Sequence, residues 1–146
     1  TSLCSMSSMN QIEEEIISDF ELFDSWEEKY HYIIELGQKL APLDEKYKLD
    51  EYKIKGCQSS VWLNGEERDG KIYFSADSDS TFVKGEIALL MMVLSGQTPE
   101  AILDAKLEFI DALGLRQHIA VTRANGLAAM IKQMKTYALA ISSASK

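Results

Sequence analysis

Residues 87–94 are eight consecutive apolar residues, and this run constrains the fold more than any other feature of the sequence. It is too short for a bilayer, which needs roughly 18 to 20 apolar residues. Helical spacing continues around it over residues 80–95, and Gly96 follows as a stop signal. Because a helix without a polar face must be covered on all sides, the run predicts a buried central helix in a globular domain.

The composition limits the classes of partner and compartment. The chain has 146 residues, 46% of them apolar, and 15 Lys and Arg against 23 Asp and Glu give a formal charge of −8. The acidic excess argues against nucleic acid and anionic membranes as partners. Residues 1–9 lack the charged and apolar regions of a signal peptide, and two cysteines cannot form a disulfide framework. We expect a disordered tail over 1–9, a single domain over 10–146, and a reducing, cytoplasmic location.

Helical signals stand toward both ends of the chain. Asn10 with Glu13 and Ser25 with Glu28 have capping-box spacing, which predicts the starts of two helices. In the second half, helices are predicted to open at Thr98-Pro99, to cover residues 107–113 and to start near Thr122.

Between these helices the sequence changes to short β-like runs, over residues 52–54, 61–66 and 72–76. Asp69-Gly70 joins the last two runs and is a strong hairpin signal, because both central positions of a tight turn favour positive φ. The order predicts an α+β fold, in which a small three-stranded antiparallel sheet has helices before and after it.

Most classes of chemical site are absent from the sequence. The eight glycines are scattered and form no phosphate-binding loop, and two His and two Cys have no metal-ligand spacing. The carboxylate runs fit solvated helix starts and turns. We therefore expect no cofactor-binding and no metal-ligating residues.

Cys57 is the exception. A lone cysteine is usually a small core residue, but Gly56 before it allows a tight turn, and Gln58, Ser59 and Ser60 after it do not suit a core. Lysines just upstream, at 53 and 55, would lower the pKa of the thiol and favour the nucleophilic thiolate. These features indicate a thiol presented at the tip of a loop.

The segment Ile-Lys-Gly-Cys-Gln-Ser-Ser-Val-Trp at residues 54–62 resembles the signature loop of the SufE family, whose members accept sulfur from cysteine desulfurases during iron–sulfur cluster assembly. Further blocks similar to the family follow the same order along the chain. They are Trp-Glu-Glu-Lys-Tyr at 26–30 with Ile-Ile-Glu-Leu-Gly at 33–37, Asp-Ser-Asp at 77–79 with Val-Lys-Gly at 83–85, and Thr-Arg-Ala-Asn-Gly-Leu at 122–127.

The resemblance implies a function and a set of site residues. Cys57 would attack the persulfide of a SufS-like desulfurase, which uses pyridoxal phosphate, and pass the sulfur to a SufBCD-like scaffold complex; the chain itself would bind no cofactor and would not turn over independently. It also implies the fold of the U-type scaffolds, with a three-stranded sheet. Asn125 departs from the glutamine that family members usually have. The supporting residues that the resemblance implies are Gly56, Gln58, Ser59, Trp62, Asp77, Lys84 and Arg123.

Structural roles compete with these functional ones. Trp62 fits a core strand, Asp77 and Asp79 fit caps of the helix that follows, and Lys84-Gly85 fits a close contact between helices. Arg123 opens a helix, where the macrodipole disfavours a cation, so a specific partner or a persulfide anion would explain it better.

Two other functions stay open at this point. One is a cysteine hydrolase or transferase, with His118 or His31 as the base for Cys57. The other is an interaction module in which Cys57 is inert. A cluster scaffold fits less well, because a cluster needs several cysteine ligands. The sequence does not decide whether the free protein forms a weak homodimer.

Overall fold

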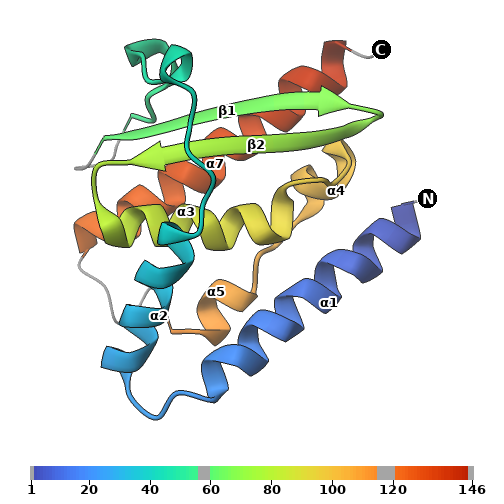
Figure 1. Cartoon of the computed structure of the whole chain (residues 1–146). Coiled ribbons are helices and arrows are strands. Elements are labelled where there is room, and N and C mark those ends of the chain that lie inside the picture. Colours follow the sequence, from blue (N-terminus) through green and yellow to red (C-terminus); the bar gives the residue numbers. More distant parts are fainter. Residues whose placement is uncertain (1, 56–59, 115–120, 145–146) are drawn as a thin grey trace.

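The computed structural model describes residues 2–55, 60–114 and 121–144, except for the side chains of 2–8, 121–125 and 144. Helices flank a single β-hairpin in an α+β arrangement, and α3 runs beneath the hairpin in the view of Figure 1. The elements are α1 (Ser2–Glu21), α2 (Trp26–Gln38), η1 (Glu45–Tyr47), η2 (Asp50–Tyr52), β1 (Val61–Arg68), β2 (Lys71–Ser78), α3 (Thr81–Leu94), α4 (Pro99–Asp104), α5 (Phe109–Ala112) and α7 (Val121–Ala144).

The first helix begins earlier than its sequence signal. Asn10 lies inside α1, which starts at Ser2, so the prediction of a cap at Asn10 is wrong and helical backbone extends through the stretch expected to be a disordered tail. The segment before Asn10 contains no Gly or Pro to stop the helix, and Met9 is buried there. The second start is confirmed: the Ser25 hydroxyl accepts the Glu28 N–H at 3.2 Å and caps α2.

The hairpin forms where Asp-Gly predicts it. Arg68 pairs with Lys71 across the turn, and φ is 54° at Asp69 and 79° at Gly70, as a tight turn with two positive φ values requires. The eight residues of β1 pair with β2 from Val61 opposite Ser78 onward.

The predicted three-stranded sheet is wrong, because the described residues form a sheet of two strands. In the predicted run over residues 52–54, Tyr52 instead belongs to the 3₁₀ turn η2 over residues 50–52, in which the Lys53 N–H donates to the Asp50 carbonyl at 3.1 Å. Acidic residues favour turns over strands. The third strand is reduced to a bridge between Lys53 and Trp62 and a bond from the Ile54 N–H to the Val61 carbonyl at 2.8 Å.

The buried central helix is confirmed as α3. Its apolar run is buried apart from Met91 and Met92, and Ser80 caps it through a bond from the Val83 N–H. α2 crosses α3 with backbone against backbone: a Cβ on Gly85 would overlap the Ile33 carbonyl, and one on Gly37 would lie 2.7 Å from the Gly85 nitrogen. The close helix contact that Gly85 suggested is therefore confirmed.

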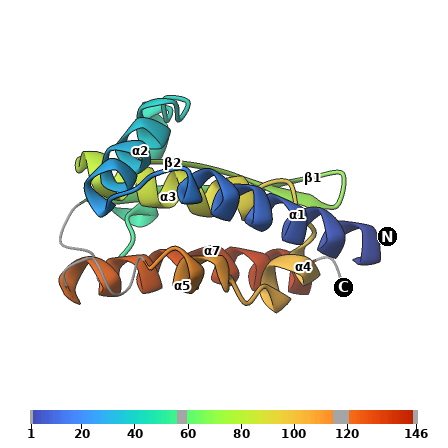
Figure 2. The same ribbon diagram turned by 90° about the horizontal axis from the view of Figure 1, so that it is seen from below.

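The remaining helices complete the core around α3, with α7 and α4 packed against each other (Figure 2). Thr98 caps α4 with Pro99 in its first turn, as predicted. The inner face of α7 buries Leu127, Met130, Met134 and Ala138, which keep the helical spacing read from the sequence. The Tyr137 hydroxyl donates to the Leu63 carbonyl at 2.9 Å and ties α7 to β1.

Candidate functional site

Residues 56–59, here called the Cys57 segment, lie outside the described residues, so Gly56, Cys57, Gln58 and Ser59 have no described positions. The residues on either side of the segment belong to the described fold. The bond from the Ile54 N–H to the Val61 carbonyl joins the two sides at the start of β1. The described residues on either side of the segment therefore meet at the end of the hairpin opposite the Asp69-Gly70 turn (Figure 1).

Ser60, the residue after the Cys57 segment, is held by three hydrogen bonds. Its N–H donates to Asp79 Oδ1 at 3.1 Å, and its carbonyl accepts the Asp79 N–H at 3.2 Å and the Ser78 hydroxyl at 2.8 Å. Asp79 therefore hydrogen-bonds Ser60 and does not cap α3, because the N-cap of α3 is Ser80. Together Ile54, Ser60, Val61, Ser78 and Asp79 form what we call the segment base.

Asp77 lies beside the segment base and forms ion pairs with two lysines. Its carboxylate is 3.3 Å from the Lys84 ammonium and 3.2 Å from the Lys48 ammonium, and Lys48 also reaches Glu45 at 3.3 Å. The prediction that Asp77 caps α3 is wrong, because its carboxylate binds these lysines and its own neighbour, the Ser78 N–H.

The groups around Asp77 favour its charged carboxylate. Burial by itself would raise the pKa of Asp77, but the Ser78 N–H and the two ammoniums together outweigh burial and hold that pKa below its ordinary value. Asp77 and then Glu45 raise the pKa of Lys48 in return. Lys84 thus has a charge partner next to the segment base, in addition to its position beside Gly85.

Trp62 lies opposite Asp77 in the hairpin and is partly buried. Its neighbours Val61 and Leu63 are fully buried. Because successive strand residues point to opposite faces, Trp62 lies on the face away from them, and the expectation that it is a core residue is not met. Arg123 falls in the first turn of α7, as predicted, and its side chain is outside the described residues, as is His118. His31 is exposed on α2.

Sequence reasoning missed three residues of this region: Lys48, Ser60 and Ser78. Lys48 binds a partner 29 positions away and Ser78 one 18 positions away, so only the folded chain brings them together. The run Asp-Ser-Asp-Ser at 77–80 was a usable signal, since short polar side chains in series tend to bond nearby backbone groups. The 44–52 segment is also tied to β1, by the Tyr47 hydroxyl on Glu66 Oε1 at 2.9 Å.

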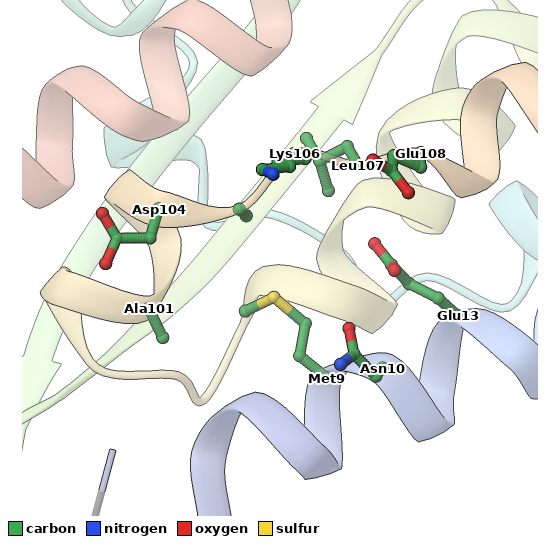
Figure 3. Close-up of a pocket in the computed structure, with 9 residues that line it drawn as sticks. Met9, Asn10, Glu13, Ala101, Asp104, Lys106, Leu107 and Glu108 are labelled. Carbon is green, nitrogen blue, oxygen red and sulfur yellow. The ribbon is translucent and has the colours of Figure 1, made fainter. Parts of the chain in front are cut away.

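A cavity of about 280 Å³ lies elsewhere, between α1 and residues 101–108 (Figure 3). The carboxylates of Glu13 and Glu108 point toward each other there. Burial, and then repulsion from Glu108, raise the pKa of Glu13. Trp62, Asp77 and Lys84, the predicted site residues whose side chains the structure describes, do not line this cavity.

Two kinds of feature are absent from the described residues. No helix among them is long and apolar enough to cross a membrane. Within the same residues, no group of three or more His, Cys, Asp or Glu side chains is arranged to hold a metal ion.

Known proteins resemble this chain over most of its length. Residues 14–138 match the SufE family, described as an Fe-S metabolism associated domain. An uncharacterised SufE-like protein of Rhizobium meliloti (strain 1021) is 37% identical over 131 residues, which cover 86% of this chain and 93% of the relative. The solution structure of a hypothetical protein from Thermus thermophilus superposes with a TM-score of 0.72 at 21% identity, over 87% of this chain and 93% of that one, and so shares the fold. The chain belongs to the SufE family.

Proposed function

We propose that this protein is a sulfur acceptor and carrier. Cys57 takes a sulfur atom from the persulfide of a pyridoxal-phosphate cysteine desulfurase, stimulates that enzyme, and passes the sulfur on for iron–sulfur cluster assembly. The observation that carries the proposal is the segment base, which holds Ile54 and Ser60 on either side of the Cys57 segment. Membership of a family described by Fe-S metabolism supports it.

The chemistry needs one thiolate and no cofactor. The Cys57 thiolate attacks the outer sulfur of the desulfurase persulfide, a new S–S bond forms at Cys57, the old S–S bond breaks, and the desulfurase cysteine leaves as its thiolate. The electrons balance without an oxidant or reductant, because the transferred sulfur keeps its oxidation state. The chain thus acts as a carrier in a reaction that the desulfurase begins, in a reducing cytoplasmic setting.

The segment base suits this exchange. A carrier thiol must reach into another protein's active site and must still return to its own fold. The residues on either side of the segment are bonded to the hairpin, Ile54 at the start of β1 and Ser60 at the end of β2. Asp77 and its two lysines lie beside this base. The supporting residues Asp77 and Lys84 therefore stabilise the end of β2, to which Ser60 is bonded.

A hydrolase is less well supported. The described candidate base, His31, is exposed on α2 in a shallow surface with Phe23 and Tyr32 and is not part of the segment base. An interaction module without a reactive thiol is tested directly by substitution of Cys57.

The test is stimulation of a cysteine desulfurase, measured as the rate of alanine formation, with binding measured separately by calorimetry. Cys57→Ser should bind the desulfurase and fail to stimulate it, whereas Cys4→Ser should act as the parent protein does. Full stimulation by Cys57→Ser would overturn the carrier function and favour the interaction module. Equal losses in both variants would show that Cys57 has no special role.

A further inference from the structure

The Ser78 hydroxyl connects Ser60, the residue after the Cys57 segment, to the N-terminus of the central helix α3. The hydroxyl donates to the Ser60 carbonyl at 2.8 Å and accepts the Ser80 N–H at 3.2 Å. Ser60 directly follows the Cys57 segment, and Ser80 is the N-cap of α3. A hydroxyl can donate and accept at once, so a single side chain of two heavy atoms connects the two elements.

The two sides of this connection differ in how firmly they are held. α3 is fixed by apolar burial along its length and by the backbone contact of Gly85 with α2. Ser60 is held by hydrogen bonds to residues 78 and 79 at the end of β2. Among the residues that bond Ser60, Ser78 is the one whose side chain also bonds the N-cap of α3, and it is itself oriented by the bond from its N–H to Asp77 Oδ1 at 2.8 Å.

We propose that Ser78 is a positioning residue for sulfur transfer: it holds Ser60, the residue that follows the Cys57 segment, at a set place relative to α3. The inference rests on the proposed function. Displacement at a persulfide requires the attacking thiolate to lie in line with the S–S bond that breaks, and small displacements of a reacting group slow such steps strongly. Because its hydroxyl is used within the fold, Ser78 governs the rate of transfer in the complex and not the affinity for the desulfurase.

The kinetic test compares three variants of the full chain. Ser78→Ala should lower the maximal rate of desulfurase stimulation by about tenfold, while the concentration for half-maximal stimulation stays within about twofold. Ser78→Thr keeps the hydroxyl and suits a strand, so it should restore most of the rate. Ser75→Ala, a half-buried serine on the same strand, serves as the matched control and should stimulate as the parent protein does.

Hydrogen exchange provides a readout that needs no desulfurase. The Ser60 amide, which donates to Asp79, should exchange faster in Ser78→Ala than in the parent protein or in Ser78→Thr. Unchanged exchange in Ser78→Ala, or faster exchange with an unchanged maximal rate, would overturn the positioning role. A maximal rate of stimulation as low in Ser78→Thr as in Ser78→Ala would also overturn it. If the parent protein accepts no sulfur on Cys57, the proposed function fails, and the positioning role fails with it, whatever the exchange of Ser60 shows.

Discussion

The crossing of α2 over α3 and the base of the Cys57 segment are held together in opposite ways. At the crossing, Gly37 and Gly85 bring two backbones into contact with no space for one more carbon atom. At the segment base, Ser60 is held by hydrogen bonds, and Asp77 beside it binds two partly exposed lysines.

The two regions differ in how steeply their contacts are lost when atoms move apart. Close packing is lost steeply with small displacements, so the crossing has essentially one arrangement. Hydrogen bonds and ion pairs near water can open and re-form at a net cost of about 1 kcal/mol each.

The largest effect is expected at the crossing. Gly85→Ala places a methyl group against the Ile33 carbonyl, and because neither backbone can move aside, the free energy of unfolding should fall by about 3 kcal/mol or more. Urea denaturation followed by circular dichroism measures the loss. Gly65→Ala is the matched control, since its Cβ would meet the rings of Phe74 and Tyr137 at 3.1 to 3.3 Å, which can shift. A larger loss for Gly65→Ala would refute the backbone contact as the main constraint.

An intermediate effect is expected beside the segment base. Asp77→Asn removes the charge that both lysines bind and should cost about 1 kcal/mol at pH 7. Because the folded protein holds the pKa of Asp77 below its ordinary value of 3.8, the stabilisation is present above that pH and is lost as the pH falls through the folded pKa. Urea midpoints of the two proteins should converge in acid. A gap that stays constant with pH would mean that the charge of Asp77 contributes nothing.

The smallest effect is expected in the cavity, which belongs to neither region. The pKa of Glu13 is raised above its ordinary value of 4.5, so its ionisation opposes folding above the folded pKa, and this cost disappears below about pH 4.5. Glu13→Gln should therefore stabilise the protein slightly at pH 7, by less than about 1 kcal/mol because the carboxyl is partly exposed, and should have no effect at low pH. The exposed neighbour Glu14→Gln controls for net charge. An equal gain from Glu14→Gln would assign the effect to total charge.

The same contrast explains what the sequence could predict. Features signalled by a short stretch of sequence were predictable: the Ser25 cap, the Asp69-Gly70 turn, the buried helix and the close contact at Gly85. The third strand, predicted over residues 52–54, was not predictable, because Tyr52 belongs to the 3₁₀ turn η2 and only Lys53 and Ile54 bond to β1.

The segment base was only partly predictable. The block Asp-Ser-Asp at 77–79 pointed to the right place, but it suggested helix caps, whereas Asp77 and Asp79 bind Lys48 and Ser60 far along the chain. Short polar side chains can cap a helix or bond a distant strand with similar energy, and only the tertiary arrangement decides between them.

The most direct test of the account is to locate the transferred sulfur. The protein is incubated with a cysteine desulfurase and isotopically labelled cysteine, free thiols are alkylated, and the peptides are mapped by mass spectrometry. We expect one added sulfur atom, on the peptide that contains Cys57, and none on the peptide that contains Cys4. Labelled sulfur on Cys4, or on neither cysteine while the desulfurase turns over, would contradict the assignment of this chain as a carrier that uses Cys57.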